Sequence, residues 1–412
     1  MRLSETERRN ARRFIMATVF IYALGFGIVI PVLPALIMQL EGIDLPAATL
    51  IGGYLAASYA LFQFAFGPAI GGLGDRFGRR PVLLLSLFGF AADYALMGLA
   101  PNVAWLFAGR MLAGALGAVF GPANAAMADM SSSKERARNF GLVGAAFGLG
   151  FIIGPAVGGL VAEYSLRLPF FIAAGLALAN GIYGLFVFRE TMDMARARPF
   201  QIARANPLGA LIGLRHQPAL LMIALAYLLW MTSSGIYTAT WTYYAIAQFD
   251  WDSRMIGYSL GIVGASLVVF QSQVIGPAVA RFGERKVALI GLVGGIVGFA
   301  MFTAPLSTIA ALLVCAMVGV QGMVMPSLNA MMSRRVEGDA QGELQGLVGS
   351  LTALAALAAP LLYNNLLATF IAADRPTPFP GAPFILALLI ALVTVVIIWR
   401  LPRTSAATPD TA

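Results

Sequence analysis

Long apolar runs separated by short polar segments restrict the fold of this sequence more than any other feature. A helix needs about 20 apolar residues to cross a bilayer, and a backbone surrounded by lipid must satisfy its own hydrogen bonds. The runs are continuous and rich in Leu, Ala, Gly and Val, whereas transmembrane barrels show alternating segments of about ten residues. We therefore predict an all-α membrane protein with about twelve transmembrane helices. The predicted spans are 14–38, 50–72, 81–100, 103–127, 139–162, 169–188, 218–246, 255–279, 286–304, 308–332, 343–370 and 383–401.

The overall composition also indicates that the chain is surrounded by lipid. Of the 412 residues, 59% are hydrophobic and only 11% are charged, whereas soluble domains carry about 25% charged residues. So few charged groups could not cover this amount of apolar surface in water. The composition therefore excludes a soluble globular protein.

The positions of the basic residues predict the orientation of the chain. Of the 27 Lys and Arg residues, only Arg167, Arg254 and Arg375 fall in predicted outward segments, and Arg110 falls inside a span. Because cytoplasmic loops carry an excess of Lys and Arg, we predict a multi-pass protein of the bacterial inner (cytoplasmic) membrane with both termini in the cytoplasm. The same bias explains the net charge of +8 without a nucleic-acid partner.

The two halves of the sequence repeat one pattern. The tripeptide Gly-Pro-Ala at 67–69 precedes a basic loop at 75–80, and the same tripeptide at 276–278 precedes a basic loop at 281–286. Each loop follows the second predicted span of its half. Since repeated halves around a central site are typical of secondary transporters, we predict two pseudo-symmetric six-helix bundles, 1–188 and 218–412, joined by a cytoplasmic linker, 189–217.

The first basic loop contains a candidate gating motif. Asp129 lies at the predicted cytoplasmic end of the fourth span, where an arginine of this loop could reach it. We predict that such a network forms a latch with two alternative states, with a positive loop that only sets topology as the alternative. The candidate gating residues are Gly71, Asp75, Arg76, Gly78, Arg79, Arg80 and Asp129.

A second motif lies in the fifth span, where small residues recur four apart around a proline. Small residues allow helices to approach closely in membranes, and proline removes a backbone donor and bends a helix. We predict a helix bend and a tight seam between the two halves, with ordinary close packing as the alternative. The motif residues are Gly150, Gly154, Pro155, Gly158 and Gly159.

These two motifs resemble the signature motifs of the major facilitator superfamily, and the second resembles that of its drug:proton antiporter branch. Leu106, Arg110 and Gly114 are similar to a further motif of that family. The resemblance extends to tetracycline efflux proteins through the stretches 30–34, 59–63, 75–86, 147–150, 169–174 and 344–347. It implies the major facilitator fold, proton-driven export of small lipophilic compounds, and a monomer.

Two ionisable residues stand out in the interior of predicted spans, where charge is costly and functional by default. Asp93 lies in the third span and Arg110 in the fourth, and the turn at Pro101 and Asn102 is equally distant from both. At 1.5 Å per residue in antiparallel helices, the two side chains lie at similar depth and could pair. We predict that Asp93 exchanges a proton and that Arg110 tunes it, with a static pair as the alternative.

The resemblance also has gaps. Tetracycline efflux proteins generally carry an acid in the first span, where Tyr22 stands here, a His in the eighth span and an acid in the ninth. Leu267 and Gly295 occupy the latter two positions. The single histidine, His216, lies in the linker or at the start of the seventh span. The candidates for lining a substrate cavity are Tyr22, Gln63, Asn124, Tyr237, Trp241, Gln271, Gln321 and Asn329. Trp241 alternatively belongs to an interfacial aromatic belt.

The sequence argues against an enzyme. It contains no catalytic triad, no metal-ligand cluster and no phosphate-binding loop of an ATP-driven pump, so we expect neither a cofactor nor a metal. The favoured prediction is a secondary active transporter that exports small lipophilic, tetracycline-like compounds in exchange for protons. Two alternatives stay open: a proton-coupled importer of a small nutrient, and a transport-inactive membrane receptor or scaffold.

Overall fold

The computed structural model of the protein describes residues 4–117, 119–132, 135–196, 218–336 and 341–402. All regular elements in these residues are helical. The first half contains α1 (Glu5–Val29), α2 (Leu33–Glu41), α3 (Leu45–Phe77), α4 (Arg79–Leu99), α5 (Val103–Leu116), α6 (Phe120–Met130), α7 (Arg136–Ala162), α8 (Leu168–Val187) and the short 3₁₀ helix η1 (Met194–Arg196). The second half contains α10 (Pro218–Ser234), α11 (Ile236–Ala239), α12 (Trp241–Phe249), α13 (Ser253–Val269), the π-helix η4 (Phe270–Val274), α14 (Ile275–Phe282), α15 (Glu284–Met301), α16 (Thr308–Gln321), α17 (Val324–Ser333), α18 (Gln341–Phe370) and α19 (Ala382–Arg400).

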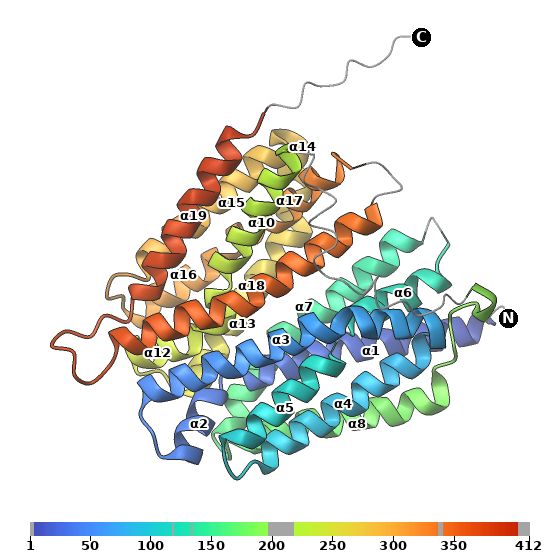
Figure 1. Ribbon diagram of the computed structural model, residues 1–412, viewed down its shortest axis with the longest axis horizontal. Coiled ribbons are helices and arrows are strands. Elements are labelled where there is room, and N and C mark those ends of the chain that lie inside the picture. The colour runs from blue at the N-terminus through green and yellow to red at the C-terminus, as the bar shows by residue number, and fades with distance from the viewer. Residues whose placement is uncertain (1–3, 118, 133–134, 197–217, 337–340, 403–412) are drawn as a thin grey trace.

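The helices form two bundles (Figure 1). Buried apolar side chains gather into one cluster drawn from residues 11–188 and a second drawn from residues 220–401. The predicted all-α fold of two helical bundles is therefore confirmed. The predicted linker lies largely outside the described residues, because the structure does not describe 197–217.

Eleven helical segments among the described residues are long and apolar enough to cross a membrane. The remaining predicted span, the ninth, is occupied by α15, which begins with Glu284, Arg285 and Lys286 and carries no charged residue after them. Its apolar part packs against α16, α17 and α19 within the second bundle. The structure is thus consistent with the predicted twelve helices.

Several predicted spans are interrupted. The first was predicted as one helix over 14–38, but α1 begins at Glu5, where Ser4 and Glu7 form a capping box, and it ends at Val29. Pro31 follows, and a new helix, α2, starts with Pro34 in its first turn. Since proline cannot donate a backbone hydrogen bond, the break follows directly from these two residues. The fourth, seventh, eighth and tenth predicted spans likewise consist of consecutive shorter helices.

The bundles contact each other mainly through two helix pairs, α3 with α18 and α7 with α13. We call the end of the molecule at which α1 begins the inner end, and the opposite end the outer end. Near the outer end, Gly53 of α3 lies against Pro360 and Asn364 of α18. Further along the same two helices, a Cβ added at Gly67 or Gly346 would meet no other part of the described chain within 4 Å. The bundles therefore converge at the outer end and diverge toward the inner end, as α3 and α18 do in Figure 1.

Candidate functional site

A cavity of about 310 Å³ lies between the two bundles. The first bundle lines it with aromatic and polar side chains of α1, α3, α5 and α7, and the second with residues of α10–α12 and α18. Its lining residues are Tyr22, Phe26, Val29, Ile30, Leu33, Gly52, Ala56, Tyr59, Ala60, Gln63, Arg110, Phe147, Met231, Gly235, Thr238, Ala239, Thr242, Tyr243, Ala355, Ala356, Ala359 and Pro360. An apolar cavity with a few polar groups at the junction of two domains is a typical small-molecule site.

One ion pair lies in the wall of this cavity. Arg110 of α5 donates to Asp93 of α4. Arg110 lines the cavity and is 7% exposed, whereas Asp93 lies behind it and is 0% exposed. A Cβ at position 109 would meet the Asp93 carboxylate at 2.7 Å, so Gly109 leaves the space that Asp93 fills. The structure therefore pairs Asp93 with Arg110, the two residues that the sequence placed at equal depth in the membrane.

The ion pair is incompletely satisfied. Asp93 Oδ1 and Arg110 Nε have no hydrogen-bond partner in the described part of the chain. The guanidinium carbon of Arg110 lies 5.6 Å from the ring centre of Tyr59 and 5.9 Å from that of Tyr94. Because a buried charge is costly unless its polar atoms are paired, the arrangement depends strongly on the charge of Asp93.

Two of the eight predicted substrate-binding residues line the cavity. The hydroxyl of Tyr22 lies 3.2 Å from that of Tyr59, and Gln63 Nε2 donates to the Tyr59 hydroxyl at 3.2 Å. Tyr59 thus links both predicted residues to the Arg110 guanidinium. Tyr59 itself was not predicted as a site residue; its signal was the i, i+4 spacing from Gln63, which places both on one face of α3.

The other predicted substrate-binding residues lie elsewhere. Tyr237 and Trp241 belong to an aromatic cluster inside the second bundle, where Trp241 is buried and donates to Ser259 Oγ at 2.9 Å. Gln321 is also buried in that bundle. Three further candidates stand on α6, η4 and α17 outside the cavity lining: Asn124, Gln271 and Asn329. The burial of Trp241 also argues against the interfacial belt.

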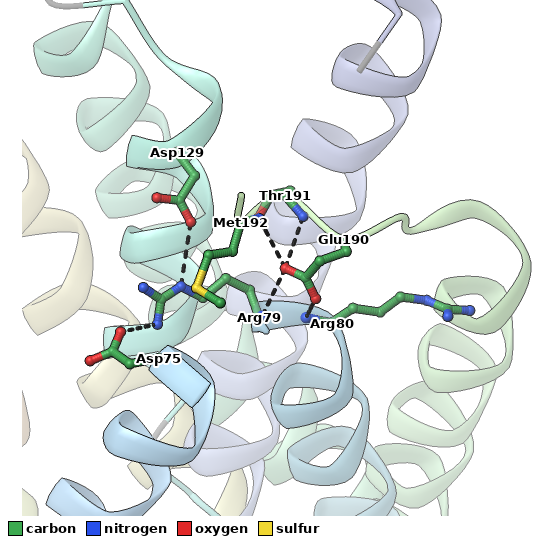
Figure 2. A network of polar contacts seen from close by, with 7 residues as sticks. All are labelled: Asp75, Arg79, Arg80, Asp129, Glu190, Thr191 and Met192. Atoms are coloured by element: carbon green, nitrogen blue, oxygen red, sulfur yellow. Dashed lines mark hydrogen bonds and ion pairs between the residues drawn. The ribbon is translucent and has the colours of Figure 1, made fainter. Parts of the chain in front are cut away.

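Polar contacts gather at the inner end around the start of α4 (Figure 2). Arg79 Nη1 lies 2.7 Å from Asp75 Oδ1, and Arg79 Nε donates to Asp129 Oδ2 at 3.4 Å. The expected contact between an arginine of this loop and Asp129 is therefore present, and Arg79 makes it. Arg80 instead donates to the Leu185 carbonyl at 2.7 Å, and Arg76 stacks over Phe77 at 4.9 Å.

Glu190 completes this network, although it was not predicted from the sequence. Its carboxylate accepts from the backbone N–H of Arg79 at 2.9 Å and of Arg80 at 3.0 Å, at the N-terminus of α4, where helix donors are unsatisfied. Figure 2 shows the carboxylate between α4 and the N–H groups of Thr191 and Met192. The only signal in the sequence was an acid two residues after the end of the sixth predicted span.

Two glycines of the gating motif differ in their surroundings. Gly78 has a φ of 98°, which L side chains rarely adopt, and a side chain there would collide with the Glu190 carboxylate. A Cβ at Gly71, by contrast, would have nothing within 4 Å of it. Gly78 is therefore required for the turn, whereas Gly71 faces open space.

The glycine-proline motif of α7 contacts both bundles. Gly150, Gly154 and Gly158 pack closely against the backbone of α1. Gly159 packs against Ser253 and Arg254 at the start of α13. The predicted seam between the halves therefore involves Gly159, while the other three glycines form a seam inside the first bundle, and α7 remains one helix through Pro155.

Two helical bundles with a central cavity and a membrane-embedded ion pair define the class of polytopic membrane transport proteins. The family model of the Major Facilitator Superfamily matches residues 15–273 and 231–412. The chain therefore belongs to the Major Facilitator Superfamily and is a transport protein rather than an enzyme.

Two relatives and one solved structure illustrate this membership. The chain is 37% identical to the tetracycline resistance protein, class C, of Escherichia coli, over 87% of this chain and 90% of that protein. It is 28% identical to multidrug resistance protein 2 of Bacillus subtilis (strain 168), over 88% and 90% of the two chains. The crystal structure of the human organic anion transporter MFSD10 (TETRAN) has the same fold, with a TM-score of 0.71, 22% identity, and coverage of 95% and 99%.

Proposed function

We propose that this protein exports small lipophilic compounds of the tetracycline type in exchange for protons. The observation that carries the proposal is the buried pair of Asp93 and Arg110, which stands directly in the wall of the central cavity. The similarity to tetracycline resistance and multidrug resistance proteins supports the direction of transport and the class of compound.

The proposed coupling follows from the charge of the pair. When Asp93 is ionised, it neutralises Arg110, and a lipophilic compound meets a cavity wall without net charge. A proton on Asp93 removes the carboxylate charge and leaves Arg110 unpaired, which costs about 2.5–3.5 kcal/mol in a membrane interior. The unpaired guanidinium then favours water over a lipophilic occupant. Proton and substrate therefore exclude each other, as exchange requires.

The proposed transport cycle uses the two ends of the molecule in turn. In this structure the cavity lies where the bundles begin to diverge toward the inner end, which we propose is cytoplasmic, with both termini on that side of a bacterial inner membrane. Export then requires the outer contacts to part and the inner ends to close. We propose that the network of Asp75, Arg79, Asp129 and Glu190 rearranges during this closure, since such networks can act as bistable elements. We further propose a monomer with bundles 1–188 and 218–412 and a linker at 189–217.

The proposal is tested in a bacterial strain that lacks its main efflux pumps. The chain, its Asp93→Asn variant and a matched control, Asp374→Asn in an exposed loop, are expressed and challenged with a panel that includes tetracycline. Protection that is lost in Asp93→Asn and kept in Asp374→Asn supports proton-coupled export. Full protection by Asp93→Asn would refute the coupling, and no protection by any form present in the membrane would favour the importer or the scaffold.

A further inference from the structure

The residues that line the central cavity indicate which ligand charge the cavity can accommodate. Arg110 is the single charged residue among the described residues that line it, and none of them is acidic. The nearest carboxylate, that of Asp93, is 0% exposed and lies behind Arg110. A positively charged ligand would therefore lose its hydration without gaining a counter-ion, which is costly in an apolar site.

Aromatic rings could in principle replace a counter-ion, because cations bind to ring faces. In this cavity, however, the Arg110 guanidinium already lies over Tyr59, and Phe147 is engaged with Phe151 at 6.1 Å between ring centres. A cation in the cavity would also face the Arg110 guanidinium rather than the Asp93 carboxylate, which lies behind it, so the pair offers no net attraction. Tyr22 and Phe26 likewise pack against Phe90 and Phe151, so these four rings mainly offer shape and apolar contact.

The polar groups of the cavity can instead donate hydrogen bonds. The Tyr243 hydroxyl is buried and has no hydrogen-bond partner in the described residues, and it lies in the half of the lining that the second bundle contributes. Gln63 uses one amide hydrogen on Tyr59 and retains a second. Uncharged donors on both sides of an apolar space suit an oxygen-bearing, neutral compound.

We propose that the cavity selects uncharged amphiphiles that accept hydrogen bonds and excludes lipophilic cations. This inference rests on the proposed function only for the identity of the cavity as the transport site. It also agrees with the proposed coupling, because a neutral ligand is compatible with the paired state of Arg110 and not with the unpaired one.

Gln63 is the position at which this selectivity is most simply changed. Its side chain lines the cavity beside Tyr59, so Gln63→Glu would place a carboxylate in the lining with almost no change of shape. Coulomb attraction at such a short distance in a partly apolar site changes a binding constant by at least about tenfold. Gln271→Glu is a matched control, since Gln271 is exposed and does not line the cavity.

The test measures equilibrium binding to the purified full-length protein in a neutral detergent by calorimetry at pH 8. The probes are triphenylphosphine oxide, which is neutral and accepts hydrogen bonds, and the methyltriphenylphosphonium cation, which has nearly the same shape. We expect the wild-type protein to bind the oxide at least about tenfold more tightly than the cation. We expect Gln63→Glu to bind the cation at least about tenfold more tightly than wild type does, and Gln271→Glu to match wild type.

The proposal is overturned if wild type binds both probes equally, if it binds neither, or if Gln271→Glu gains as much affinity for the cation as Gln63→Glu. Binding requires neither a proton gradient nor transport. A protein that shows the expected selectivity but confers no drug protection would therefore contradict the proposed function while leaving the assignment of the cavity intact.

Discussion

Gly52 of α3 is a position where one added side chain is expected to change the conformation of the whole protein. Tyr243 of the second bundle lies directly over it, and even a Cβ at position 52 would collide with the Tyr243 hydroxyl. The contact lies near the outer end, beside Asn364 Nδ2, which donates to the Thr49 carbonyl at 3.2 Å. Gly52→Val should therefore push the outer ends of the bundles apart.

The magnitude follows from the cost of overpacking, which is typically about 1–3 kcal/mol. If the variant escapes this cost by opening its outer end, the ratio of molecules with an open inner end to molecules with an open outer end falls by about 5- to 150-fold. A cysteine at position 67 reports that population. A Cβ at Gly67 would have nothing within 4 Å of it, and the position lies one turn of α3 beyond the cavity residue Gln63.

The assay is the rate of maleimide labelling of Gly67→Cys in the purified protein, in which the natural cysteine, Cys315, is buried. We expect Gly52→Val to slow labelling, with the factor above as the upper bound, and Tyr243→Ala to restore the rate when added to Gly52→Val. Gly175→Val is the control, because Gly175 also has open space around it. Labelling of Gly52→Val at the wild-type rate, or no restoration by Tyr243→Ala, would refute the reasoning.

Two further substitutions test the geometry of the ion pair and of the inner network. Gly109→Ala should displace Asp93, whose carboxylate lies 2.7 Å from where the new Cβ would stand. We expect a loss of stability of about 1–3 kcal/mol, measured as a lower thermal midpoint. An unchanged midpoint would contradict the tight fit. Glu190→Gln weakens the capping of α4, where the carboxylate accepts from Arg79 N and Arg80 N. We expect a loss of about 0.5–2 kcal/mol, again measured by the thermal midpoint. An equal effect of Asp374→Asn in an exposed loop would show that the cap is not specific.

The sequence was informative wherever one helix or one helical hairpin decides the geometry. Asp93 and Arg110 lie at equal distances from the turn between their helices, so antiparallel packing alone places them at one depth, and the structure pairs them. The sequence also related an arginine of the 75–80 loop to Asp129, because both lie at predicted cytoplasmic helix ends, and in the structure Arg79 makes this contact. The break between α1 and α2 also had a signal in the sequence, because Pro31 and Pro34 remove two backbone donors within one turn, whereas the single Pro155 leaves α7 continuous.

The cavity lining was less predictable, because it depends on how each helix is rotated and on the angle between the bundles. Polarity suggested Tyr237, Trp241 and Gln321, yet these side chains turn into the interior of the second bundle. Tyr243, two residues after Trp241, reaches the cavity instead. Successive residues of a helix are rotated by about 100°, so Trp241 and Tyr243 point in different directions. Hydropathy does not show which of the two faces the cavity.

The two halves keep the same contact at their inner ends but reverse its charges. In the first, Arg79 at the start of α4 contacts Asp129 at the end of α6; in the second, Glu284 at the start of α15 contacts Arg334 at the end of α17. Because the Coulomb attraction is the same when the two charges are exchanged, either arrangement can hold the two helix ends together. The membrane-embedded pair has no such counterpart among the described residues, because Asp93 is the one acid buried there. The repeated halves thus share the framework of the inner rim, whereas the proposed proton exchange has a single carboxyl, in the first half, on which to act.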